Sequence, residues 1–252
     1  IGSKLEHDVY TGLEVQPNAR ILWTPSGRQT LWGAVSRAVR TPARGESGQS
    51  ITVDITPPGE LIGEDVPTLT VIENEDPIKP DKLVAFEIGW RAQLEEDLFV
   101  DAVAFHNRYD DILTFEFGVP YRDDPEQPYT VLPLHLNNDM EGRTVGGELL
   151  VDWRASDRWR LRSSYTFLDK EIDSPNPRLG RDAEKGDPRH QFMHWSSVSL
   201  SAEAQADLIM RFVDQVPAQR VDSSLELDLR LRWCPDRGIC LAAGGRNLLE
   251  GA

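Results

Sequence analysis

Two histidines have a spacing that could bind a metal ion. His190 and His194 are four residues apart, so on a helix both imidazoles would lie on one face. The surrounding residues instead favour a strand, in which the two positions would lie about 13 Å apart at roughly 3.3 Å per residue. That separation is too long for a shared ion, so we predict no metal site at these residues.

The two cysteines could form a covalent link. Cys234 and Cys240 flank a short polar segment, residues 235–238, and they lack the paired spacings of a zinc site. If the segment is the turn of a hairpin, both have the parity of the polar face, and their separation would be near the disulfide range. A disulfide and two free thiols are both compatible with the sequence, and closing so short a loop would add little stability.

Residue patterns typical of enzymes are missing from the sequence. There is no nucleophile elbow, phosphate-binding loop or zinc motif, and carboxylates such as Glu148 and Asp152 belong to an alternating polar row. We therefore expect no catalytic residues and no cofactor.

The composition excludes two further classes of protein. The 252 residues include 42 Asp and Glu against 27 Lys and Arg, a formal net charge of −15. Such a chain is unsuited to nucleic acid, because phosphate binding needs clustered basic residues. No stretch approaches the roughly 18 uninterrupted apolar residues of a transmembrane helix, so we do not expect a helical membrane protein.

Apolar and polar side chains alternate with a period of two in the segments that must position these residues. Residues 224–233 place Leu225, Leu227, Leu229, Leu231 and Trp233 on one face and Ser224, Glu226, Asp228, Arg230 and Arg232 on the other. Residues 145–154 and 159–167 repeat the pattern. Apolar residues at helical spacing are not sustained anywhere. The sequence therefore predicts an all-β fold of about ten strands.

Short and long connections alternate between these strands. Tight polar turns are expected at residues 25–28, 95–97, 156–158, 201–203 and 235–238, and long connections at about residues 41–81, 118–142, 173–187 and 214–222. In an antiparallel up-and-down sheet, all the tight turns then lie at one end and all the long loops at the other. This asymmetry is typical of a transmembrane β-barrel. The alternation alone also fits a soluble β-sandwich with Trp residues in its core.

Several segments, taken in order, resemble the C-terminal part of the barrel of TonB-dependent outer-membrane receptors. They are residues 19–42 (ARILWTPSGRQTLWGAVSRAVRTP), 79–94 (KPDKLVAFEIGWRAQL), 101–112 (DAVAFHNRYDDI), 144–169 (TVGGELLVDWRASDRWRLRSSYTFLD) and 225–250 (LELDLRLRWCPDRGICLAAGGRNLLE). The resemblance implies that residues 1–252 are part of a larger, 22-stranded plugged barrel, without the plug domain and the final strand. Because no initiator Met or signal segment opens the chain, we expect an internal fragment.

The resemblance also implies a function and a location. Such a receptor captures a large scarce nutrient, such as a ferric siderophore or cobalamin, and imports it with energy from TonB, which acts through the N-terminal part of the protein. Its surroundings would be the lipid of the outer membrane of a Gram-negative bacterium, and the turn between the cysteines would face the periplasm, which permits oxidation. The rival hypothesis is a soluble extracellular β-sandwich that binds glycans.

Candidate ligand contacts follow from the same resemblance. The region of residues 41–81 would be an extracellular loop, with a small hairpin at Ile51–Ile55 and Leu69–Ile72 and acidic residues at Glu60, Glu64, Asp65, Glu73, Glu75 and Asp76. It would either help to enclose the ligand or form a mobile acidic shield. Arg37, Arg40 and Arg44 approach this loop, and Tyr121, Arg122 and Tyr129 lie in the next long connection. These arginines could hold an anionic siderophore on which the tyrosines stack, although all six could equally be solvated loop residues.

Overall fold

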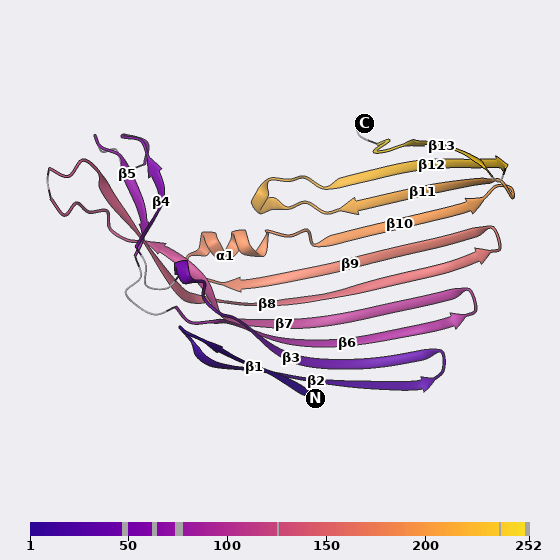
Figure 1. The fold of residues 1–252 in the computed structure, drawn as a ribbon, viewed down its shortest axis with the longest axis horizontal. Coiled ribbons are helices and arrows are strands. Elements are labelled where there is room, and N and C mark those ends of the chain that lie inside the picture. Colours follow the sequence, from indigo (N-terminus) through magenta and orange to yellow (C-terminus); the bar gives the residue numbers. More distant parts are fainter. Residues whose placement is uncertain (47–49, 62–64, 74–77, 125, 237, 250–252) are drawn as a thin grey trace.

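A curved antiparallel sheet makes up most of the molecule (Figure 1). The computed structural model describes residues 1–46, 50–61, 65–73, 78–124, 126–236 and 238–249. The strands of this part are β1 (Gly2–Asp8), β2 (Gly12–Ser26), β3 (Gln29–Arg40), β4 (Ile51–Thr56), β5 (Thr68–Ile72), β6 (Asp81–Glu95), β7 (Leu98–Phe117), β8 (Thr130–Ser156), β9 (Trp159–Asp173), β10 (His190–Ser199), β11 (Ala204–Val213), β12 (Ser224–Asp236) and β13 (Ile239–Gly245). The helices are η1 (Arg44–Glu46), α1 (Pro177–Glu184) and η2 (Pro217–Gln219), and none of these described helices is long and apolar enough to cross a membrane.

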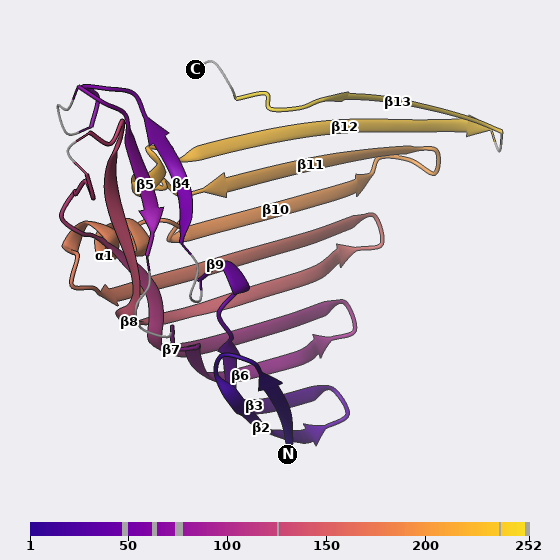
Figure 2. The same ribbon diagram turned by 60° about the vertical axis from the view of Figure 1, so that its left-hand side comes forward.

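The strands follow one another across the sheet in chain order, from β1 to β13, and only β4 and β5 lie off this path. The sheet is open, with β1 and β13 at its two edges (Figure 2). The predicted all-β, up-and-down fold is therefore confirmed. A single sheet in chain order also excludes the two-layer β-sandwich.

Five tight turns lie together at one end of the sheet, on the right in Figure 1. They join β2 to β3, β6 to β7, β8 to β9, β10 to β11 and β12 to β13, as predicted. Serine hydroxyls stabilise several of them. The Ser156 hydroxyl accepts from the Arg158 amide at 3.3 Å, and the Ser201 hydroxyl accepts from the Glu203 and Ala204 amides at 3.2 and 3.1 Å. These local bonds explain why short polar segments reverse the chain.

Helix α1 in the connection 173–187 was not predicted. The Asn176 side chain caps it by accepting from the amides of Arg178 and Leu179 at 3.1 and 3.4 Å, and Pro177 occupies its first turn. Leu179 is its one large apolar residue, so no apolar stripe marks the helix and the cap is its main signal.

Helix α1 lies against the part of β9 that extends beyond β10. The pairing of β9 with β10 begins at Phe167. Beyond it, the Glu184 carboxylate accepts from the Ile172 amide at 2.9 Å, and the Lys170 ammonium pairs with Asp187 at 2.6 Å. The helix and the residues after it therefore satisfy polar groups on an otherwise open strand edge.

Strands β1 and β8 also differ from the prediction. β1 was not expected, because its sequence alternates weakly, yet it pairs with β2 along its whole length. β8 begins at Thr130, so the connection expected at 118–142 covers only residues 118–129. The first residues of β8 pair with β5, a long-range contact that leaves no local pattern in the sequence.

The two faces of the sheet differ as the alternation predicted. We call the side of Leu225, Leu227, Leu229, Leu231 and Trp233 the apolar face, and the opposite side, with Glu226, Asp228, Arg230 and Arg232, the polar face. The register keeps the apolar rows of neighbouring strands together, because Leu229 on β12 lies opposite Leu208 on β11. Leu229, Leu231 and Trp233 are 43, 56 and 50% exposed. The sheet therefore carries a broad apolar surface without a protein layer over it.

Candidate functional site

Ion pairs join neighbouring strands across the polar face. Arg91 on β6 pairs with Asp101 on β7 at 2.6 Å, and Asp152 on β8 pairs with Arg160 and Arg162 on β9 at 2.8 and 2.5 Å. On β11, Arg211 pairs with Glu226 and Asp228 of β12 at 3.0 and 2.7 Å. These ion pairs make this face polar along the strands, in contrast to the apolar rows on the other face.

The two long connections at residues 41–81 and 118–129 combine into one small structure at the opposite end from the tight turns (Figure 2). The β4–β5 hairpin predicted there is present. Strand β5 then pairs in parallel with β8, from Thr68 opposite Thr130 to Ile72 opposite Leu134, and Tyr121 pairs with Val131 on the other side. We call β4, β5, residues 117–121 and residues 130–134 the loop platform.

The loop platform has a buried core of its own. Thr68 and Thr130 are 2 and 4% exposed, and Val71, Val131 and Leu132 are each 7% exposed. Elsewhere most side chains of the described sheet are half-buried or exposed. The described part of residues 41–81 therefore packs against the second long connection and is not fully exposed to solvent. Of its predicted acidic residues, Glu64, Glu75 and Asp76 lie outside the described residues.

Arg40 connects the two ends of the excursion that carries the hairpin. Its guanidinium donates from Nε to Asp81 at 2.6 Å and from Nη1 to Glu46 at 3.2 Å, and the hydrogen bond to Asp81 raises the pKa of Arg40. Arg37 donates to the Val15 carbonyl and lies 3.6 Å from the Glu14 carboxylate. Arg44 is exposed in η1.

Tyr121 and Arg122 attach the second connection to the platform. The Tyr121 hydroxyl donates to the Glu73 carboxylate at 2.7 Å; this bond, with burial, raises the pKa of Tyr121 to about 12. Arg122 donates to the Thr130 hydroxyl at 2.9 Å, and Tyr129 is half-buried. The structure thus places these three residues at the platform and the three arginines at the base of the excursion. The role of both groups in ligand binding stays a prediction.

Asn138 was missed by the sequence analysis and fixes the end of the excursion. Its side chain accepts from the Lys79 amide at 2.7 Å and donates to the carbonyls of Lys79 and Asp111 at 3.0 and 2.8 Å. Asp111 has a left-handed backbone, with φ of 55°, at a shift in the β7–β8 register. A single asparagine within a strand gives no sequence signal for this role.

Comparison with known proteins identifies the architecture. The family model described as "TonB dependent receptor-like, beta-barrel" matches residues 4–248. The chain belongs to this family. No curated protein sequence matches it significantly.

Solved structures of siderophore receptors and of a copper transporter share the fold of this chain. A ferric enterobactin receptor (PfeA) mutant from Pseudomonas aeruginosa is 14% identical, with a TM-score of 0.70 over 98% of this chain and 36% of its own. The siderophore receptor PirA from Acinetobacter baumannii is 13% identical, with a TM-score of 0.68 over 96% of this chain and 38% of its own. The copper transporter OprC is 16% identical, with a TM-score of 0.59 over 94% of this chain and 34% of its own. The chain therefore spans little more than a third of the length of these proteins.

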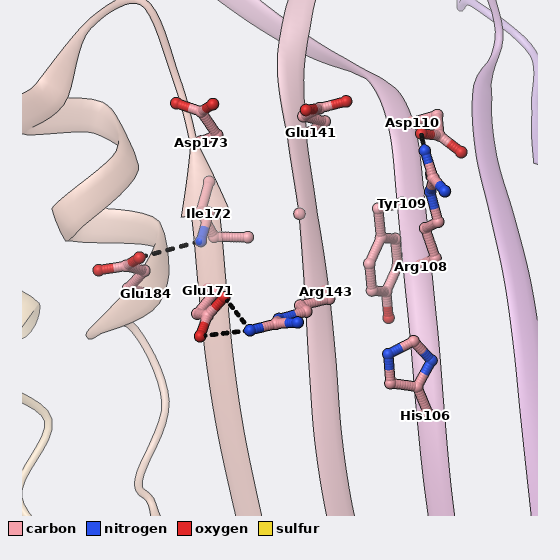
Figure 3. Close-up of a pocket in the computed structure, with 11 residues that line it drawn as sticks. His106, Arg108, Tyr109, Asp110, Glu141, Arg143, Glu171, Ile172, Asp173 and Glu184 are labelled. Carbon is pink, nitrogen blue, oxygen red and sulfur yellow. Dashed lines mark hydrogen bonds and ion pairs between the residues drawn. The ribbon is translucent and has the colours of Figure 1, made fainter.

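A charged hollow of about 690 Å³ lies where the long strands of this receptor barrel approach the loops, between β7, β8, β9 and α1 (Figure 3). Arg143 on β8 reaches Glu171 on β9 at 2.6 Å, and Arg108 pairs with Asp110 within β7 at 3.2 Å. By register, Arg108, Arg143 and Glu171 share the side of the sheet occupied by Val145 and Leu149. The hollow therefore marks the end of the apolar face and does not belong to the polar face.

The histidines and cysteines of the receptor barrel are also placed. His190 and His194 lie on strand β10, where the Nδ1 atoms contact the Tyr165 hydroxyl at 2.8 Å and the Ser163 hydroxyl at 2.9 Å. Among the described residues, no group of three or more His, Cys, Asp or Glu could hold a metal ion. Cys234 and Cys240 form a disulfide beside the β12–β13 turn, with their Cα atoms 4.1 Å apart.

Proposed function

We propose that this chain is part of the barrel of an outer-membrane receptor that takes up a ferric siderophore or a similar large nutrient, with the loop platform forming part of the external binding surface. The observation that supports this most directly is the ordered core of the platform at the loop end of the sheet. A flexible shield would not need buried threonines and valines, whereas a binding surface gains affinity from being ordered before the ligand arrives.

The two faces of the sheet support a location in the Gram-negative outer membrane. The apolar face would contact lipid, and the polar face, with its ion pairs between strands, would line the interior against water and the plug domain. Energy from TonB would reach the ligand through the remainder of the receptor. The siderophore receptors among the structural neighbours support a ferric siderophore as the ligand class, and cobalamin is a less supported member of the same proposal.

The arginine and tyrosine candidates have distinct places in this proposal. Tyr121, Arg122 and Tyr129 would lie at the ligand side of the platform. Arg37, Arg40 and Arg44 would hold the base of the excursion, and Arg40 would do so through its two carboxylate partners.

A deletion in the complete receptor tests the role of the platform. Replacing residues 45–76 with a short Gly/Ser linker removes β4 and β5, but the pairing of β3 with β6 lies outside this segment. Loop closure depends only weakly on length, about 0.6 kcal/mol per doubling, so the barrel should still insert. Binding and uptake by whole cells of a panel of ferric siderophores that includes ferric enterobactin should fall.

A pair of matched substitutions distinguishes the effect of disrupting the core of the platform from the effect of adding a negative charge to it. Val71→Asp places an unpaired carboxylate in the core of the platform, whereas Val53→Asp places the same group on β4 at a side chain that is 50% exposed. At equal surface abundance, the first change should weaken ligand binding much more than the second. Unchanged binding in the deletion and in Val71→Asp would refute a role for the platform in ligand capture.

A further inference from the structure

One hydrogen-bonded polar pair lies at the centre of the apolar face. On β9, Ser163 is the midpoint of the apolar-face residues that run from Trp159 to Phe167. On β10, His194 is the midpoint of those that run from His190 to Val198. The two midpoints lie directly opposite each other in the register, and the Ser163 hydroxyl is 2.9 Å from His194 Nδ1. Both side chains are half-buried. A titratable group therefore occupies the depth where a lipid-facing surface is most apolar.

The other strands show that this is a local exception. The three central positions of the apolar face are Ala19, Ile21 and Trp23 on β2; Leu31, Gly33 and Val35 on β3; Phe86, Ile88 and Trp90 on β6; Val100, Ala102 and Ala104 on β7; Gly147, Leu149 and Val151 on β8; Ala206, Leu208 and Met210 on β11; and Leu227, Leu229 and Leu231 on β12. None of these described positions carries a charged, hydroxyl or imidazole group. Among the strands compared, polar groups occupy these central positions only on the adjacent strands β9 and β10.

More polar groups extend the pair into a stripe along these two strands. The Tyr165 hydroxyl contacts His190 Nδ1 at 2.8 Å, and Trp159 Nε1 donates to the Ser196 hydroxyl at 2.9 Å. We call Ser163, Tyr165, His190, His194 and Ser196 the β9–β10 polar stripe. Each hydroxyl, and each neutral imidazole, can both donate and accept a hydrogen bond. Within the described contacts, the second ring nitrogen of His194 has no hydrogen-bond partner.

Lipid cannot form hydrogen bonds with the polar atoms of this stripe. The hydrocarbon region has no groups that donate or accept hydrogen bonds, so polar atoms there are normally paired within protein. A protein surface with matching polar groups at the same depth would satisfy the atoms that remain. The two-fold symmetry that is most common among homo-oligomers brings a surface patch against its own copy.

We propose that the β9–β10 polar stripe is a contact between two copies of the receptor in the membrane, related by a two-fold axis along the membrane normal. Such an axis places each residue of one copy at the depth of the same residue in its partner. Groups that both donate and accept can pair with their own kind, whereas a stripe of like charges would repel itself. The stripe is therefore self-complementary, and the apolar rows around it supply the remainder of the contact.

Cross-linking of the complete receptor in native outer membranes tests this contact. Leu161→Cys and Phe192→Cys introduce single thiols on the apolar face beside the stripe, while the two native cysteines are already joined. Leu229→Cys provides the control, because it lies at comparable depth on β12, away from the stripe. Mild oxidation should give a covalent dimer of the receptor for the first two variants and little or none for Leu229→Cys. Equal yields from all three, no dimer from either stripe variant, or products with a different protein would overturn the proposal.

A second measurement removes the polar groups without introducing thiols. Ser163→Ala combined with His194→Leu should convert the dimer to a monomer in sedimentation experiments in a mild detergent, and Met210→Leu, at the neighbouring position on β11, should leave the dimer intact. Heat-modifiable migration on gels checks that each barrel is folded. A folded double variant that remains dimeric would also overturn the proposal.

Discussion

Leu229→Arg in the complete receptor is the most direct test of which face of the sheet contacts lipid. Leu229 lies midway between Leu225 and Trp233, four residues from each end of their row. At about 3.4 Å per residue each end is roughly 14 Å away along the strand, and a tilt of about 40° leaves Leu229 about 10 Å in depth from each edge of the apolar band. An arginine this close to the bilayer midplane should cost about 2–4 kcal/mol.

The adjacent residue provides a control in which the substitution is reversed, from a charged to an apolar side chain. Arg230 lies on the polar face and has no ion pair among the described residues, so Arg230→Leu should change the free energy of unfolding by about 0.5 kcal/mol or less. Leu229→Ala measures the loss of the apolar side chain without the charge. The assay is reversible denaturant unfolding of the receptor in lipid vesicles, with the free energy extrapolated to zero denaturant.

The test compares the change in free energy of unfolding caused by Leu229→Arg with the change caused by Arg230→Leu. If Leu229→Arg and Arg230→Leu change the free energy of unfolding by equal amounts, then the assignment of the apolar face to lipid is wrong. A larger cost for Arg230→Leu would reverse the two faces.

Three further predictions concern the turn, the platform and the sheet edges. Replacing both Cys234 and Cys240 with Ser should lower the free energy of unfolding by less than the roughly 3 kcal/mol expected for a 15-residue loop, because the two are only six residues apart; denaturant midpoints would measure this. The pKa of Tyr121 should fall from about 12 towards the usual value near 10 in Glu73→Gln, measured as the phenolate absorbance that Tyr121→Phe removes. Because the folded pKa is the raised one, the stabilisation from this bond should persist up to about pH 10 and be lost as pH rises through 12; a phenolate signal at pH 10 equal to that of free tyrosine would contradict the bond. The 252-residue chain alone should not give a monodisperse monomer in buffer without detergent, because β1 and β13 are unpaired edges that template aggregation, and size-exclusion chromatography would reveal a monomer if this is wrong.

The sequence predicted those features whose cause lies within a few residues. The row from Leu225 to Trp233 indicates a strand with two different faces, and Ser156 or Ser201 beside acidic residues indicates a tight turn. Because the same two signals recur along the chain, the topology and the end at which the loops gather could also be predicted.

The features that were missed depend on partners distant in the sequence. Thr130 begins a strand because Thr68 pairs with it. The local sequence around either residue does not indicate this pairing. Helix α1 depends on the Asn176 cap and on contacts with β9 rather than on an apolar stripe. The candidate arginines and tyrosines were selected by chemical type, which cannot tell that Arg40 binds Asp81 or that Tyr121 binds Glu73.

The irregular step at Asp111 has a consequence for how such receptors can diversify. Strand β8 extends from the platform to the tight turn at Ser156, but its pairing with β7 shifts register twice, opposite residues 109–114 of β7, and Asn138 holds the chain at this point. The angle of the platform over the barrel is therefore set by a few residues outside the apolar rows. Insertion or removal of one residue at this step would point the platform in a new direction without disturbing the membrane wall. Natural variation could thus alter what a receptor encloses while the strands that cross the bilayer keep their sequence pattern.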